Sequence, residues 1–285
     1  MIIGRDDGAP ALIELELLIL LASVAAGAFG ALVGVGGGLI LVPLLTIVFG
    51  VDIKVAVAAS LLGVIAVSTT ASSAYLTRGW VDRRLGLLLL VATSFGGILG
   101  GYIAGLLDGR VVAGIFGLVL VLVALQMARR RTHVPPPADV APGRLEFDSS
   151  YFEPTTGEEV HYRARRVGVG GLISIGAGAL SGLLGIGGGV VNVPTMNVLM
   201  GIPIRVATST STYMLGATAV ASAVLYYSRG EIDGLLAAPV VVGMLVGARS
   251  GAQLAPRVPT RALQLVFGLI AIVFAAQMLL RAWNT

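Results

Sequence analysis

Apolar residues follow one another along this chain in runs much longer than the core elements of a water-soluble protein. Residues 11–50 are almost continuously apolar, and further apolar runs follow up to residue 129. About 20 consecutive apolar residues span a bilayer as a helix. The pattern therefore predicts an all-α polytopic membrane protein, with helices over roughly 11–33, 54–77, 84–107 and 110–129 and a shorter one over roughly 38–50.

A glycine-rich segment interrupts the first apolar run, and the same segment occurs again later. Gly34-Val35-Gly36-Gly37-Gly38 precedes Pro43, and Gly185-Ile186-Gly187-Gly188-Gly189 precedes Pro194 with the same spacing. Adjacent glycines and a proline break a helix. Inside a bilayer, a broken helix persists only where protein or a water-filled cavity satisfies its freed backbone groups. Paired breaks of this kind in two half-chains point to a transporter's binding site.

The two glycine segments belong to a duplication that covers most of the chain. At a constant offset of 151 residues, the distance from Gly34 to Gly185, Ser60 matches Ser211 and Tyr75 matches Tyr226 without a gap. Self-similarity at a fixed offset indicates a structural repeat. We therefore divide the chain into a first transmembrane repeat over 1–131, a linker over 132–166 and a second transmembrane repeat over 167–285.

The linker differs from both repeats in composition. It follows Arg129-Arg130-Arg131, contains Pro135-Pro136-Pro137, and has further arginines near its end. Two short polar runs, 144–151 and 159–165, flank Pro154-Thr155-Thr156-Gly157, which predicts a small β-hairpin. Dense arginines at both ends place this linker in the cytoplasm.

Loop charges bear on the relative orientation of the repeats. The turn at 78–84 carries three arginines, whereas its counterpart at 229–235 has one arginine and two acids; the turns at 108–110 and 257–261 shift the other way. This predicts inverted repeats of about five helical segments each, if the short helices after the glycines cross the membrane. A parallel arrangement of four plus four spans stays open, because the total charge tally barely separates the two.

Composition excludes several classes of protein. The chain is 56% hydrophobic and 12% charged, with a mean hydropathy of +0.94, outside the range of soluble domains. It contains no cysteine, which removes disulfides and thiolate sites. The high pI reflects arginines beside apolar segments rather than a nucleic-acid surface. We expect the lipid bilayer as a partner, no nucleic acid, and a retained N-terminal membrane segment. A homodimer is compatible with the sequence.

The predicted helices also lack residues that intramembrane catalysis or proton coupling needs. Both histidines, His133 and His161, lie in the linker, and only Glu14 and Glu16 among the acids fall within an apolar run. We therefore expect no enzyme activity, no metal site, no cofactor and no buried carboxylate relay. Transport would then be driven by the substrate gradient and the membrane potential.

The doubled glycine motif, each copy followed by a proline and a serine-bearing helix (Ala58-Ala59-Ser60 and Thr210-Ser211-Thr212), resembles the sulfite exporter TauE/SafE family. The resemblance covers nearly the whole chain except the linker. It implies a multi-pass transporter of the bacterial inner membrane that exports small sulfur-containing anions such as sulfite, thiosulfate or sulfoacetate.

Candidate binding residues are those that could offer donors to an anion. Broken helices present backbone N–H groups, although glycines also serve close helix packing, which we favour for isolated ones such as Gly96 and Gly247. Arg249 lies inside an apolar run, either as an anion counter-charge or as a side chain that snorkels to the interface. The predicted substrate-binding residues are Gly36, Gly37, Gly38, Pro43, Ser60, Gly187, Gly188, Gly189, Asn192, Pro194, Thr208, Ser211 and Arg249.

Two further expectations concern the whole molecule. The glycine segments should meet near the middle of the membrane, with the substrate's charge facing the more polar second repeat.

Three other functions compete with the export of sulfur-containing anions. They are an anion channel, a transporter of a non-sulfur organic anion, and a membrane scaffold that uses the linker.

Overall fold

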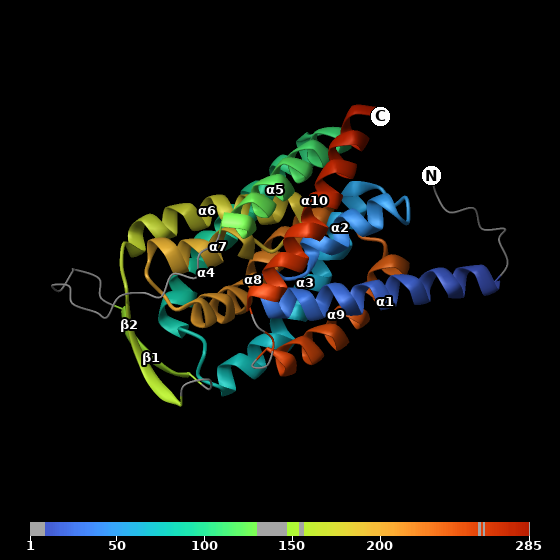
Figure 1. Ribbon diagram of the computed structural model, residues 1–285. Coiled ribbons are helices and arrows are strands. Elements are labelled where there is room, and N and C mark those ends of the chain that lie inside the picture. Colours follow the sequence, from blue (N-terminus) through green and yellow to red (C-terminus); the bar gives the residue numbers. More distant parts are fainter. Residues whose placement is uncertain (1–8, 130–146, 154–156, 256–257, 259, 285) are drawn as a thin grey trace.

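The computed structural model describes residues 9–129, 147–153, 157–255, 258 and 260–284, and these are mostly helical (Figure 1). The first repeat consists of α1 (Ala9–Val33), α2 (Gly38–Ile47), α3 (Ile53–Thr77), α4 (Arg83–Leu106) and α5 (Gly109–Arg129). These five helices confirm the predicted segments. The second repeat consists of α6 (Val167–Leu184), α7 (Gly189–Pro194), the π-helical turn η1 (Thr195–Leu199), α8 (Ile204–Ser228), α9 (Gly234–Leu254) and α10 (Thr260–Asn284).

Both repeats contain helices that could span a membrane. Among the described residues, six helices are long and apolar enough to cross a bilayer, which confirms a polytopic membrane protein: Glu14–Val33, Ile53–Thr77, Arg83–Leu106, Gly109–Gln126, Val167–Leu184 and Gly234–Leu254. Helix α8 is as long as its counterpart α3 but is not among them. The hydroxyl groups in its sequence lower its mean hydropathy.

The first helix of each repeat packs against the fourth helix of the other repeat. A Cβ atom at Gly96 of α4 would lie 2.0 Å from the carbonyl oxygen of Ile175 in α6, and one at Gly247 of α9 would lie 2.0 Å from that of Val24 in α1. These distances are too short for any side chain, so glycine lets the two backbones touch. The structure therefore shows the packing role favoured for these isolated glycines.

The last helices of the two repeats pack antiparallel. Gly114 of α5 faces Ala282 of α10, and Gly117 faces Leu279, so residue numbers rise along one helix as they fall along the other. Figure 1 shows the same opposition between the first helices, because α6 begins beside the β-hairpin whereas α1 begins at the opposite end of the molecule. These two pairs of helices, α5 with α10 and α1 with α6, therefore run in opposite directions.

The predicted hairpin in the linker is present. Strand β1 (Phe147–Glu153) pairs antiparallel with β2 (Glu158–Ala164), and Glu153 lies opposite Glu158. The turn residues 154–156, like the arginine and proline clusters at 130–137, lie outside the described residues.

This hairpin docks on the helical bundle. The Tyr162 hydroxyl donates to a carboxylate oxygen of Asp82 at 3.2 Å. Arg205 of α8 forms an ion pair with Glu153 at 3.0 Å and stacks on the Trp80 ring at 4.7 Å. Burial, with the nearby carboxylate of Asp82, raises the pKa of Tyr162 above its usual value, which keeps the hydroxyl proton in place for this bond.

Candidate functional site

The glycine segments turn the chain back on itself. Gly36 and Gly37 have φ of 84° and 80°, and Gly187 and Gly188 have φ of 78° and 74°. This left-handed conformation is open to glycine and strained for other residues. A Cβ atom at Gly37 would lie 2.6 Å from the carbonyl oxygen of Ala26, so α2 begins by folding back along α1.

The second glycine segment makes the same reversal. A Cβ atom at Gly188 would lie 2.9 Å from the carbonyl oxygen of Ala177 in α6. Each repeat therefore begins with a helical hairpin, formed by α1 and α2 in the first repeat and by α6, α7 and η1 in the second. We call the segments 34–38 and 185–189 the first and second glycine loops.

The two glycine loops touch one another. A Cβ atom at Gly38 would lie 2.1 Å from the carbonyl oxygen of Gly185, and one at Gly189 would lie 2.0 Å from that of Gly34. A fully buried serine of α3, Ser60, donates to the Gly185 carbonyl oxygen at 2.8 Å. The carbonyl that each loop frees is thus held by the opposite repeat, as a broken helix in a membrane requires.

The reciprocal bond completes the pair. Ser211 of α8 donates to the carbonyl oxygen of Gly34 at 3.1 Å, and its side chain is also fully buried. The hydroxyl protons of Ser60 and Ser211 are therefore committed to backbone oxygens. Val64 and Leu215 fill the remaining space, since Cβ atoms at Gly36 or Gly187 would lie 3.1 to 3.3 Å from their methyl groups.

The remaining predicted residues lie at different depths around the loops. Asn192 is 1% exposed, and its side-chain oxygen has no hydrogen-bond partner among the described residues. Thr208 packs directly against the first loop, because a Cβ atom at Gly34 would lie 2.7 Å from its methyl group. Pro43 is buried within α2, and Pro194 is half-buried at the end of α7.

Sequence similarity to known proteins agrees with this architecture. The model of the family described as "Sulfite exporter TauE/SafE" matches residues 19–278. The chain belongs to the TauE/SafE family. No solved structure matches it.

Curated relatives resemble the chain along nearly their whole length. The "Probable membrane transporter protein YunE" of Bacillus subtilis is 27% identical, over 92% of this chain and 97% of its own. A "Probable membrane transporter protein" of Xylella fastidiosa is 28% identical, over 88% and 90%. The "Probable membrane transporter protein MJ0441" of Methanocaldococcus jannaschii is 24% identical, over 94% and 97%. The chain is therefore a member of a family of probable membrane transporters.

Arg249 is not brought to the glycine loops. Its side chain is exposed on the surface of α9, five residues before the helix ends at Leu254. The fold thus favours the interpretation in which the guanidinium snorkels along the helix surface to the interface.

One polar residue at the second loop escapes prediction. Ser181 of α6 is fully buried, and its Cβ lies 3.4 Å from the position that a Cβ at Gly188 would occupy. Its counterpart at the offset of 151 is Gly30, so the departure from the repeat is the available signal. A lone serine in an apolar helix, however, ordinarily bonds to its own helix.

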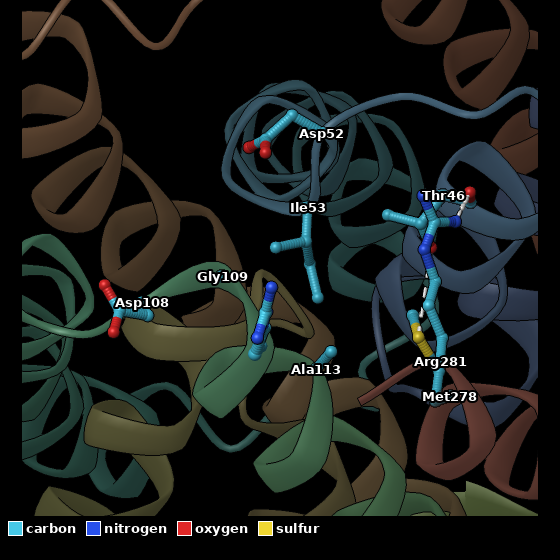
Figure 2. Close-up of a pocket in the computed structure, with 9 residues that line it drawn as sticks. Thr46, Asp52, Ile53, Asp108, Gly109, Ala113, Met278 and Arg281 are labelled. Carbon is cyan, nitrogen blue, oxygen red and sulfur yellow. Dashed lines mark hydrogen bonds between the residues drawn. The ribbon is translucent and has the colours of Figure 1, made fainter. Parts of the chain in front are cut away.

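A pocket of about 530 Å³ opens at another place, between the start of α3, the start of α5 and the end of α10. Figure 2 shows Asp108 and Arg281 on opposite sides of it, and Arg281 donates to the backbone oxygen of Thr46. Asp52 in its wall caps α3 by accepting from the Lys54 N–H at 2.8 Å. Its charged residues are exposed, as is usual for turns between membrane helices. In the described residues, no group of three or more acidic or histidine side chains could hold a metal ion.

Proposed function

We propose that this TauE/SafE protein is a secondary transporter that exports small sulfur-containing anions, such as sulfite, thiosulfate or sulfoacetate, across the inner membrane. The observation that carries the proposal is the meeting of two glycine loops, one from each repeat, at the buried centre of the helical bundle. Loops of this kind offer backbone N–H donors with no side chain in the way of an anion. The family description and the names of the relatives support transport and, for the family, sulfite.

The repeats are inverted across the membrane in this proposal. Antiparallel packing of the equivalent helices α5 and α10 supports a two-fold axis that lies in the membrane plane. The reversal at each glycine loop makes α2 and α7–η1 separate segments, which gives five per repeat. Arginines gather at the end where the β-hairpin docks, which places that end in the cytoplasm: Arg78, Arg83, Arg84, Arg165, Arg166 and Arg205.

Two groups of three helices are the moving parts of the proposed mechanism. One consists of α1, α3 and α9, and the other of α6, α8 and α4, so each combines both repeats. Arg78, directly after α3, donates to the Ala252 carbonyl oxygen of α9 at 2.8 Å, and Arg229, directly after α8, donates to that of Gly101 in α4 at 2.9 Å. These bonds and the close glycine contacts make each group rigid.

The contacts between the groups are fewer and involve mainly α3 and α8. Ser68 of α3 donates to the Thr212 carbonyl oxygen at 2.7 Å and accepts from the Gly216 N–H at 2.9 Å. Rocking of one group against the other about this contact would open the glycine loops to each side of the membrane in turn. The tight closure of the loops by Val64 and Leu215 favours such a carrier over a permanently open channel.

Flux through the purified protein in liposomes tests the proposal. Sulfite, thiosulfate and sulfoacetate are offered separately, with acetate as the matched anion without sulfur. Saturable uptake of at least one sulfur anion, together with thermal stabilisation at millimolar concentration, is the expected result. Flux that rises linearly without saturation supports a channel, and preference for acetate supports a transporter of other organic anions. Either outcome overturns the proposal.

A further inference from the structure

Buried polar atoms without a partner gather on the second helical hairpin. Among the described residues these include Oγ of Ser174 and Ser181 on α6 and Oδ1 of Asn192 on α7. Each of the three side chains is at most 1% exposed. Burying a hydroxyl or an amide without a partner is unfavourable, so such groups call for a functional or structural reason. The other unpartnered hydroxyl groups, those of Ser72 in α3 and Ser94 in α4, lie on two separate helices.

The two serines lie on one face of α6. They are seven residues apart, which is close to two helical turns. Gly170, one turn before Ser174, faces the sulfur of Met200, and Ser181 lies against Gly188 of the second glycine loop. This face of α6 is therefore turned toward the segment that runs through α7 and η1, where Asn192 lies.

Backbone donors are free at the same place. In the first glycine loop, the N–H groups of Val35 and Gly36 donate to the carbonyl oxygen of Gly30 at 3.2 and 3.4 Å. In the second loop, Gly185 donates to the Ser181 carbonyl oxygen at 2.8 Å, but within the described part of the chain the N–H groups of Ile186 and Gly187 have no such bond. The two loops therefore have similar φ angles, but the two N–H groups after the first glycine are hydrogen-bonded in the first loop and unbonded in the second.

The first repeat has no equivalent set of groups. Ser23, which corresponds to Ser174, donates to the carbonyl oxygen of Ile19 at 2.7 Å. Gly30 corresponds to Ser181, and Leu41 corresponds to Asn192, so neither position carries a polar side chain. The second hairpin also continues into the π-helical turn η1 where α2 is regular, and such turns occur frequently at functional sites.

We propose that the hairpin of α6 and α7 holds the oxyanion subsite of the transporter. The Ser181 hydroxyl, the side-chain amide of Asn192 and the N–H groups of Ile186 and Gly187 are the donors, and Ser174 is the next polar contact along α6. An amide can rotate to present its NH₂ group, so Asn192 can donate from the same position. Neutral donors bind an oxyanion without the strong hold of a buried cation, which suits a carrier that must release it. The subsite rests on the proposed function for the identity of its anion.

The absence of cysteine from the chain makes a direct test available. Ser181→Cys and Ser174→Cys are made singly in the otherwise native protein, with Ser23→Cys as the matched control in the first repeat. The rate of alkylation by N-ethylmaleimide is measured in liposomes, with and without sulfoacetate or acetate. We expect both second-repeat cysteines to react at least tenfold faster than the control, and sulfoacetate to slow the Ser181→Cys reaction severalfold.

The outcomes separate the subsite from the transported anion. If Ser181→Cys reacts as slowly as Ser23→Cys, or if no anion protects it, the subsite is overturned, whatever the flux measurements show. If acetate protects and sulfoacetate does not, the subsite stands and the sulfur assignment fails. A second measurement uses Ser181→Ala, which should raise KM for sulfoacetate about tenfold at an unchanged melting temperature, whereas Ser23→Ala should leave KM unchanged. Equal KM values for both variants would count against the subsite.

Discussion

The two helical hairpins at the centre of the molecule share a backbone but not an environment. Around the first hairpin, the buried residues Val67 and Ala71 of α3 and Met244 of α9 are apolar. At the corresponding positions around the second, Thr218 and Ser222 of α8 and Thr93 of α4 are polar and equally buried. Thr218 donates to the Thr93 hydroxyl at 2.9 Å. Duplication thus preserved the architecture while the chemistry of the two halves diverged.

That difference distinguishes residues that stabilise the fold, which both halves share, from residues proposed to bind an anion, which only the second half has. Features present in both halves, such as the glycine loops and the serine bonds between them, hold the bundle together. Features present in one half, such as Ser181 and Asn192, contribute nothing to that shared architecture. Met244 fits the same logic, because its flexible side chain fills the space beside Gly37 and Gly63, whereas its counterpart Thr93 accepts a hydrogen bond from Thr218.

Glycine substitutions where the loops touch should have the largest effect. Gly38→Ala and Gly189→Ala each place a Cβ atom about 2 Å from a carbonyl oxygen of the opposite loop, where only backbone movement can relieve the clash. We expect each to cost at least the ~1–3 kcal/mol typical of overpacking and to abolish flux. Melting temperature and flux are measured together. Gly171→Ala, at an open position of α6, is the control. If Gly189→Ala leaves the melting temperature and the flux unchanged while Gly38→Ala lowers both, the two loops are not equivalent.

Exchange of a polar residue for its apolar counterpart should affect transport more than stability. Asn192→Leu gives the second hairpin the residue found at position 41. Because the substitution keeps the number and branching of the side-chain heavy atoms and removes an unpartnered polar atom, we expect the melting temperature to hold or rise. Transport efficiency, kcat/KM, should fall at least tenfold if the amide contacts the anion, which corresponds to about 1.4 kcal/mol. The reverse change, Leu41→Asn, should lower stability and give no gain in transport.

The reciprocal serine bonds should contribute equally to stability. Ser60→Ala and Ser211→Ala each leave a buried carbonyl oxygen of the opposite loop unsatisfied. Hydrogen bonds between membrane helices average about 0.6 kcal/mol, and an orphaned group raises the loss to about 1–2 kcal/mol. Unfolding of the two variants by a denaturing detergent checks this. A large difference between them would mean that the two loops are not equivalent supports.

Much of this fold can be predicted from the sequence, because it depends on local patterns. The lengths of the apolar runs predict α1 to α5, and the sequence match at an offset of 151 residues predicts the corresponding helices of the second repeat. The direction of α2 cannot be predicted, since the close approach of Gly37 to Ala26 is a tertiary contact. The same limit applies to Arg249, because an unbroken apolar run does not show which face of α9 is exposed. For Ser181, the sequence cannot show whether a serine bonds to its own helix, as Ser23 does.

The β-hairpin should have the smallest effect, and it has no counterpart in the first half. Glu153→Gln weakens the ion pair with Arg205, and Tyr162→Phe removes the bond to Asp82; for each we expect about 0.5–1.5 kcal/mol, read as a lower melting temperature. Asp148→Asn, at an exposed ion pair within the hairpin, should change nothing measurable.

The stabilisation that the docked hairpin provides should also depend on pH, and it should decrease at alkaline pH. The raised pKa of Tyr162 means that the docked hairpin binds a proton more tightly than the unfolded chain does. Its contribution is therefore complete below the ordinary tyrosine pKa of about 10 and declines as the pH rises above that value. Burial and the neighbouring Glu153 also raise the pKa of Tyr151. Tyr162→Phe should therefore reduce the alkaline decline, while Glu153→Gln should retain the part that Tyr162 contributes. An identical alkaline profile for both variants would show that Tyr162 does not bind Asp82 in the folded protein.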